Sequence, residues 1–203
     1  MTERSVTERT LDACHFEALA RPAIRGLPVY DPGHDLVSLR ERAGAEALVE
    51  LGSNENPYGA SPRVRDALLA QLDQLHRYPD PRGSRLKRAL AAAHAVDPGQ
   101  IMLGNGSHEL LMQLCQVFAG EGDEVVFSQY GFAVFHLAAR ASGATPRAVD
   151  ALSPSGPMPL GHDLDAMADA ITPATRLVYL ANPNNPTGTW FGQAALEAFM
   201  SRI

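Results

Sequence analysis

Three asparagines and two prolines lie close together in LANPNNPTGTW, residues 180–190. The stretch begins where the apolar run LVYL, residues 177–180, ends, and such a run is typical of a buried strand. Asn, Pro and Gly are common in any loop, but proline also fixes φ at its own position and restricts the residue before it. The side-chain amide of Asn185, which precedes a proline, is therefore predicted to be held rigidly. It follows a strand, and α/β sheets bind ligands at the carboxyl ends of their strands.

A second candidate is GNGSHE, residues 104–109. A glycine turn that opens a helix directs backbone N–H groups and the positive end of the helix dipole at one point, which suits a phosphate. Gly106, Ser107 and His108 would form this seat. The same letters also fit a plain strand-to-helix turn with Ser107 as its cap, and the stretch alone does not decide between the two. A dinucleotide fingerprint would need a third glycine where Glu109 stands, which argues against a Rossmann site.

A third candidate is Tyr130 in FSQYGF, which follows another predicted strand. An aromatic side chain at this edge can stack on a planar ring, although taken alone the residue fits a partly buried tyrosine at a helix start. Successive strand ends thus offer a phosphate seat, a flat stacking surface and a rigid amide. Together they predict a site for a phosphorylated aromatic ring.

Alternating strands and helices position these candidates. Hydrophobic spacing, turn residues and capping residues predict strands at 101–103, 123–128, 144–150 and 176–181, and helices at 62–76, 84–94, 107–119, 131–141 and 163–171. Strands that alternate with helices indicate a mostly parallel sheet with right-handed crossovers and helices on both faces. The sequence therefore predicts an α/β fold.

Composition narrows the class of protein. The formal net charge is −6, and the 17 basic residues form no stripe, so neither nucleic acid nor an anionic membrane is expected as a partner. No apolar run is long enough to span a bilayer and the start lacks a signal-peptide core, so we expect a cytoplasmic protein. Cys115 lies in an apolar run and is expected to be a buried thiol. The seven histidines have no paired spacing, so no metal site is predicted.

Four ordered motifs resemble those of a known family. NPNNPTG and GNGSHELL, with SNENPYG at 53–59 and RYPDP at 77–81, resemble fold-type I pyridoxal-phosphate (PLP) aminotransferases, most of all the histidinol-phosphate aminotransferases. The resemblance implies the large domain of that fold, with residues 1–50 as an amino-terminal arm and part of the small domain. Residues 51–203 would be the first part of the PLP-binding large domain, incomplete at its carboxyl end.

The resemblance also implies roles for single residues. In similar enzymes the turn at Gly106, Ser107 and His108 holds the cofactor phosphate, the tyrosine matching Tyr130 stacks on the pyridine ring, and the asparagine matching Asn185 bonds the ring hydroxyl. Further implied roles fall on Tyr78, which would reach the cofactor phosphate of the other subunit of a homodimer, and on Tyr30 and Asn54, which would lie near the substrate.

The sequence departs from the family pattern at two positions and has no evident catalytic lysine. His108 stands where relatives usually carry Asp or Asn, and Val29 stands where a proline commonly precedes the tyrosine. The sole lysine, Lys87, lies in RLKRALAAAH, where a solvated helix face is the expected setting. The family's pyridine-binding aspartate and Schiff-base lysine are expected beyond Ile203, so no catalytic residue is assigned and the 203 residues are expected to be an inactive amino-terminal part.

The implied activity is amino transfer between L-histidinol phosphate and 2-oxoglutarate or glutamate, in histidine biosynthesis. Three alternatives stay open from the sequence. Another PLP enzyme, an aromatic aminotransferase or a phosphothreonine decarboxylase, shares similar motifs. A non-catalytic protein could have kept the fold without the lysine. A nucleotide-binding α/β domain fits least well, because the third glycine is missing.

Overall fold

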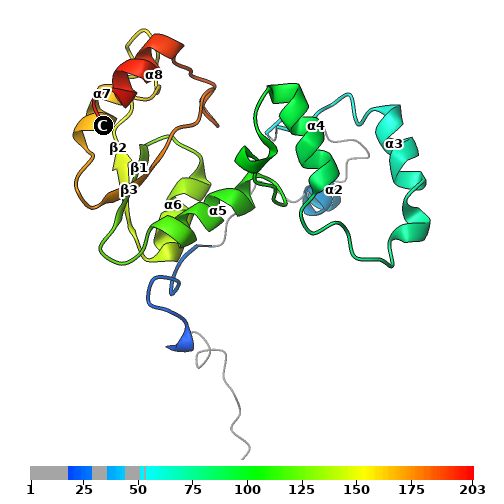
Figure 1. The fold of residues 1–203 in the computed structure, drawn as a ribbon. Helices are drawn as coiled ribbons and strands as arrows, with labels where there is room; N and C mark the ends of the chain where they lie inside the picture. Colours follow the sequence, from blue (N-terminus) through cyan, green and yellow to red (C-terminus); the bar gives the residue numbers. More distant parts are fainter. Residues whose placement is uncertain (1–17, 29–35, 44–50, 53) are drawn as a thin grey trace, which may run out of the picture. The chain divides into compact units, whose positions relative to one another are not determined.

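The computed structural model describes residues 18–28, 36–43, 51–52 and 54–203 (Figure 1). These fall into two compact units, one made of residues 18–28 and 104–203 and the other of the described residues within 31–103. The predicted domain boundary at residue 50 stays a prediction.

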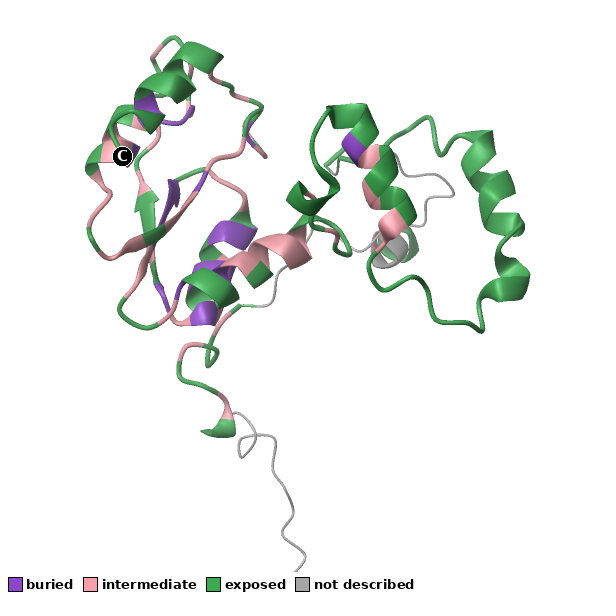
Figure 2. Cartoon of the chain, in the orientation of Figure 1, coloured by how far each residue is buried: buried purple, intermediate pink, exposed green. Residues whose placement is uncertain are grey.

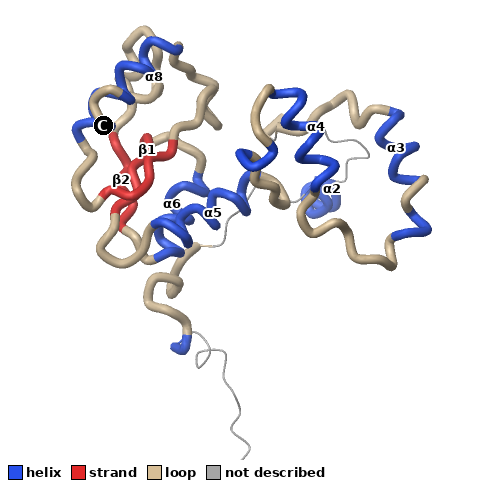
Figure 3. The backbone as a smooth tube through the Cα atoms, in the orientation of Figure 1, coloured by secondary structure: helices blue, strands red, loops and turns tan. Residues whose placement is uncertain are grey.

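A three-stranded parallel sheet lies at the centre of the first unit (Figure 3). Its strands are β1 (Glu124–Ser128), β2 (Thr145–Val149) and β3 (Thr175–Tyr179), in the order β2-β1-β3. In the register of the sheet, Val126 of β1 lies opposite Arg147 on one side and Val178 on the other. The strands predicted at 123–128, 144–150 and 176–181 are confirmed. Because all three run in parallel, their carboxyl ends meet at one edge.

Helices cover both faces of this sheet, as predicted. They are α5 (Ser107–Phe118), α6 (Ala133–Ser142), α7 (Leu164–Asp169) and α8 (Gln193–Met200). One apolar cluster joins α5 and α6 to the sheet, and a second joins Val126 of β1 to Met167 of α7 and Phe199 of α8. The sheet is thus the middle layer of three, the arrangement expected for strands that alternate with helices.

Aromatic side chains fill the core beneath α5 and α6. Phe135 is only 4% exposed, and its ring stacks on that of Tyr179 with centroids 4.6 Å apart. The Tyr179 hydroxyl donates to the carbonyl oxygen of Leu111 at 2.6 Å and lies 3.2 Å from Cys115 Sγ. Cys115 is fully buried, as predicted, and burial raises the pKa of its thiol. This layer is stabilised by apolar burial, and the buried hydroxyl has a hydrogen-bond partner.

Charged side chains hold the amino-terminal edge of the sheet. Glu124 accepts hydrogen bonds from Thr172 Oγ1 at 2.7 Å and from Arg147 Nε at 2.9 Å, and together they lower the pKa of its carboxyl. Asp123 pairs with Arg176 at 3.1 Å. These contacts link all three strands at the edge opposite the candidate site.

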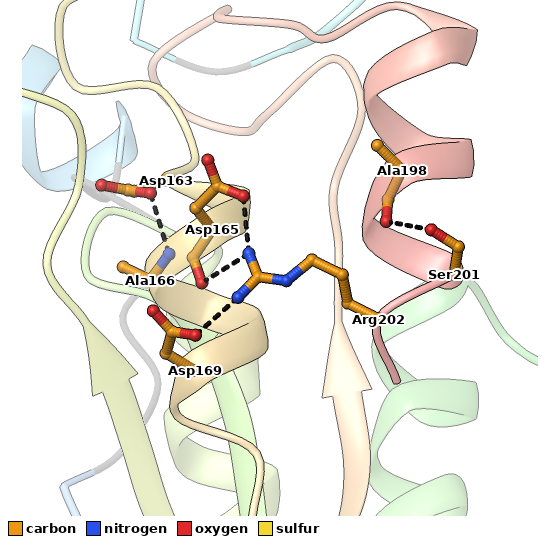
Figure 4. A network of polar contacts seen from close by, with 7 residues as sticks. All are labelled: Asp163, Asp165, Ala166, Asp169, Ala198, Ser201 and Arg202. Carbon is orange, nitrogen blue, oxygen red and sulfur yellow. Dashed lines mark hydrogen bonds and ion pairs between the residues drawn. The ribbon is translucent and has the colours of Figure 1, made fainter.

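A small polar network joins the end of α8 to α7 (Figure 4). The Arg202 guanidinium reaches Asp165 Oδ1 and Asp169 Oδ1, each at 2.6 Å. Asp163 caps α7, since its Oδ1 accepts from the Ala166 N–H at 2.9 Å. The two aspartates that bind Arg202 are largely exposed, so water screens these ion pairs and their contribution to stability is small.

The second unit is made of helices and turns. Its elements are α2 (Leu36–Ala43), α3 (Pro62–Leu69), the 3-10 turn η1 (Leu72–Gln74), α4 (Ser84–His94) and the 3-10 turn η2 (Pro98–Gln100). Figure 2 shows nearly all of it as exposed, in contrast to the buried residues around the sheet. Asp80 precedes α4, and its carboxylate accepts from the N–H groups of Arg82 and Ser84, which lower its pKa.

Three expectations for this part of the chain are wrong. The strand predicted at 101–103 does not form, because a strand needs a neighbour for its backbone groups and none of the described residues pairs with this segment. The helix predicted at 62–76 ends at Leu69 and continues only as a 3-10 turn. Lys87 is partly buried in α4, on the side that includes the buried Ala91, so its setting is not a fully solvated face.

Candidate cofactor site at the carboxyl edge of the sheet

The amino end of α5 has the geometry that the glycine turn predicts. Gly106 is its N-cap residue, with φ 86° and ψ 168°, a conformation that favours glycine over any residue with a side chain. Ser107 is the first helical residue and is exposed, and His108 follows it, partly buried. Within the described residues no side chain caps α5. The first N–H groups of this 12-residue helix can therefore act as donors to an anion.

Glu109 stabilises the turn before α5. Its carboxylate accepts from the backbone N–H of Asn105 and, at 3.2 Å, from Asn105 Nδ2, while Gln113 Nε2 donates to its other oxygen at 3.3 Å. In the sequence this residue stands out only as a mismatch to the dinucleotide fingerprint. A Glu in the first turn of a helix is a common capping signal and could have been recognised as one.

Tyr130 and the NPNNPTG loop meet at the neighbouring strand ends. Tyr130 follows β1 and is 41% exposed, and the loop follows β3, which pairs directly with β1. A hydrogen bond joins them, since Asn184 Nδ2 donates to the Tyr130 carbonyl oxygen at 2.9 Å. The structure thus brings together two of the predicted features, the stacking surface and the asparagine loop.

The asparagines of this loop have different surroundings. Asn184 is buried at 3% exposure, whereas Asn185 is half-buried and its side chain has no hydrogen-bond partner among the described residues. Asn182 is exposed and bonds the backbone of Phe191 through both side-chain atoms, at 2.9 and 3.0 Å. Prediction from sequence identified Asn185, which precedes a proline, but missed Asn184, whose contact with Tyr130 forms only in the folded chain. The amide of Asn185 is left able to bind a ligand.

Other predicted site residues lie in the second unit or outside the described residues. Tyr78 and Asn54 belong to the second unit, and both are exposed, Tyr78 completely. Lys87 also lies in that unit. Tyr30 lies outside the described residues.

A cavity of about 350 Å³ lies elsewhere in the first unit, between α7, α8 and the segment before them. Its walls include Met158, Trp190 and Phe191, together with His162. His162 is 8% exposed, and burial lowers its pKa.

Within the described ranges, no group of three His, Cys, Asp or Glu side chains could hold a metal ion. No helix in the described part of the chain combines the length and apolarity that crossing a membrane requires.

Comparison with known proteins places this geometry in a family. The family model "Aminotransferase class I and II" matches residues 46–203. Histidinol-phosphate aminotransferase 2 of Pseudomonas aeruginosa is 47% identical over 190 residues, covering 93% of this chain and 50% of that protein. The enzyme of the same name from Hydrogenovibrio crunogenus is 46% identical over 182 residues, covering 90% and 47%. The chain spans about half the length of the curated relatives it matches.

Solved structures agree with the fold. Histidinol-phosphate aminotransferase from Sinorhizobium meliloti, in complex with pyridoxal-5'-phosphate, superposes with a TM-score of 0.77 at 29% identity, over 90% of this chain and 47% of that one. Aspartate aminotransferase from Thermus thermophilus, with maleate, gives 0.70 at 28% identity, over 82% and 44%. The predicted fold-type I large domain, present in part, is confirmed. The chain belongs to the aminotransferase class I and II family.

Proposed function

We propose that this chain is part of a PLP-dependent aminotransferase that exchanges an amino group between L-histidinol phosphate and 2-oxoglutarate in histidine biosynthesis. One observation carries the proposal: the asparagine loop and Tyr130 are hydrogen-bonded together at the carboxyl edge of a parallel sheet. The relatives named histidinol-phosphate aminotransferase support the choice of substrate.

The donor groups of the sheet-containing unit fit PLP. The phosphate needs several N–H donors, and the uncapped amino end of α5 at Gly106 and Ser107 can supply them. The ring needs a flat apolar neighbour, and Tyr130 is exposed enough to offer one face. The ring hydroxyl needs a fixed polar partner, and the half-buried amide of Asn185 can serve. The backbone N–H of His108 would add to the phosphate seat whatever its side chain does.

Each residue has a positioning task in this proposal. When bound, PLP supplies an electron sink that makes a proton at the α-carbon of an amino substrate removable. Ser107 and the α5 backbone would bind the phosphate. Tyr130 would stack on one face of the pyridine ring, and Asn185 would fix the orientation of the ring by a hydrogen bond to its hydroxyl. Tyr30 and Asn54 would contact the substrate. The proton at the α-carbon needs a lysine base, and the sole lysine of the sequence, Lys87, lies in the other unit.

The activity can be tested directly on the protein made from its complete coding sequence. We expect PLP to bind and amino transfer from histidinol phosphate to 2-oxoglutarate to exceed transfer from tyrosine or phenylalanine by at least tenfold in kcat/KM. The 203-residue chain alone should be inactive. Equal or greater activity on the aromatic amino acids would replace the histidinol-phosphate assignment with an aromatic aminotransferase.

We further propose that the protein is a homodimer in which Tyr78 acts on the cofactor phosphate of the neighbouring subunit. Its complete exposure within this chain supports the idea, since a tyrosine of a binding motif is then available to a second copy. Tyr78→Ala and Asn185→Ala variants, each nearly inactive, should regain part of the activity when mixed and reassembled, because one site of each mixed dimer is intact. Absence of any gain after proven subunit exchange would contradict the shared site. The cytoplasmic location stays a prediction from the sequence.

A further inference from the structure

Asn184 is the most tightly held residue of the NPNNPTG loop. Its side chain is 3% exposed, and its Nδ2 donates both to the Tyr130 carbonyl oxygen at 2.9 Å and to Thr187 Oγ1 at 2.8 Å. Its backbone is held as well, because its N–H donates to Thr189 O and its carbonyl accepts from the Gly188 N–H, both at 2.8 Å. Asn184 is therefore hydrogen-bonded both to other residues of its own loop and to Tyr130, which follows β1.

Hydrogen-bond chemistry fixes the direction of this amide. A backbone carbonyl only accepts, so the atom facing Tyr130 O must be the NH2 group of Asn184. Asn184 Oδ1 is buried and has no hydrogen-bond partner among the described residues, so Nδ2 alone orients the group. An aspartate of the same shape would place an acceptor against an acceptor at this point. The contact thus needs a donor, which asparagine supplies and an ionised aspartate does not.

We infer that Asn184 is a positioning residue of the cofactor site, which keeps the ring-stacking Tyr130 and the hydroxyl-binding Asn185 in register. Its side chain sets the backbone of Tyr130, and its own backbone carries Asn185 as the next residue. The two groups lie 55 positions apart in the sequence and at the ends of different strands, so a shared anchor is needed to fix their spacing. The inference rests on the proposed function, because it takes PLP as the ligand of both groups.

Asn182 provides a matched control. It is an asparagine of the same loop, and its side chain makes two good hydrogen bonds, at 2.9 and 3.0 Å. Both go to the backbone of Phe191, and neither goes to Tyr130. Replacing Asn182 therefore removes as much local bonding without touching the proposed link.

The test measures PLP affinity and the visible circular dichroism of bound PLP in the protein made from its complete coding sequence. Asn184→Ala and Asn184→Asp should weaken PLP binding at least tenfold and change the dichroic band, because the ring loses its fixed stacking partner. Asn182→Ala should weaken binding less than threefold and leave the band unchanged. In a Tyr130→Ala background the effect of Asn184→Ala should shrink to less than threefold, since the hydrogen bond to the residue 130 carbonyl then has no aromatic ring to position.

Each other outcome is decisive. Equal effects of Asn184→Ala and Asn182→Ala, or an undiminished effect without the Tyr130 ring, would overturn the positioning role while leaving PLP binding by the wild type intact. If both Asn184 variants fail to fold while Asn182→Ala folds, the residue is structural and the inference is wrong. A wild-type protein that does not bind PLP would instead overturn the proposed function, and the inference with it.

Discussion

The two units of the chain bury their apolar residues very differently, although their sequences have similar helical patterns. In α6, Val134 and Phe135 are 0% and 4% exposed. In α3 none of the eight described residues is buried, and Val64 and Leu68 remain 48% and 64% exposed. In the second unit, Ala91 is the one buried apolar residue among residues 39–42, 51–52 and 54–103.

The difference shows what hydrophobic spacing determines. Spacing fixes which side of a helix is apolar, but burial needs a second surface, and the β-sheet provides one for α5, α6, α7 and α8. Within its own unit, the described residues provide none for α3. Val64 and Leu68 therefore stay exposed within this unit.

The sharpest test of this comparison removes one large apolar side chain from each unit. Phe135→Ala should lower the free energy of unfolding by about 3–5 kcal/mol, because it leaves a cavity against Phe127 and Tyr179. Leu68→Ala should cost about 0.5 kcal/mol or less, as expected for an exposed position. Urea unfolding followed through Trp190, the sole tryptophan, reports on the unit that contains the sheet, and hydrogen exchange of the α3 amides reports on the unit that contains Leu68. A similar loss for both variants would mean that α3 is covered by residues that the structure does not describe.

Removing a single hydroxyl group from the same core should lower the free energy of unfolding by a smaller amount. Tyr179→Phe removes the hydroxyl that donates to Leu111 O at 2.6 Å and leaves the ring stack with Phe135 in place. The expected loss is about 1 kcal/mol, the net value of one buried hydrogen bond. Tyr58→Phe is the control in the other unit, since Tyr58 is 95% exposed and its loss of a hydroxyl should not change stability. A neutral Tyr179→Phe would show that packing alone holds this layer.

Much of the sheet-containing unit could be predicted from sequence, because the segments whose residue pattern predicts a strand also find a neighbouring strand in the fold. The strands β1 and β3 are apolar runs that end in turn residues, and α6 and α7 begin and end near their predicted limits. Residues 101–103 carry the same kind of apolar signal as a strand and do not form one. A strand is a property of two segments, so a run without a neighbour cannot become one.

The sequence predicted which residues would form the candidate site, but not which of them contact one another. Gly106 and Tyr130 lie at turns where glycine and an aromatic residue were expected to serve a ligand. Asn184 was missed because its role comes from Tyr130, a residue that the fold alone brings near. Roles that depend on the meeting of two distant segments are not encoded in either segment.

Helix caps offer a finer comparison of the units. Asp163→Ala should cost about 1 kcal/mol in the unfolding followed by Trp190, because the Ala166 N–H loses its acceptor at the start of α7. Asp80→Ala should leave that transition unchanged and instead speed hydrogen exchange of the first amides of α4, since Ser84 N–H bonds Asp80 at 2.7 Å. A shift of the Trp190 transition by Asp80→Ala would show that the two units unfold together.

The smallest expected effect is a dependence of stability on pH that comes from His162 in the sheet-containing unit. Burial lowers the pKa of His162 below its ordinary value of 6.5, so the unfolded chain binds this proton more readily than the folded one. Stability from this group is therefore complete above pH 6.5 and declines as the pH falls from there toward the folded pKa. His162→Gln should flatten this decline in the Trp190 transition between pH 7 and 5, whereas His94→Gln, at an exposed position of α4, should leave it unchanged. An unaltered decline in His162→Gln would mean that carboxylates such as Glu124, whose lowered pKa gives a loss of stability in the same direction at lower pH, account for all of it.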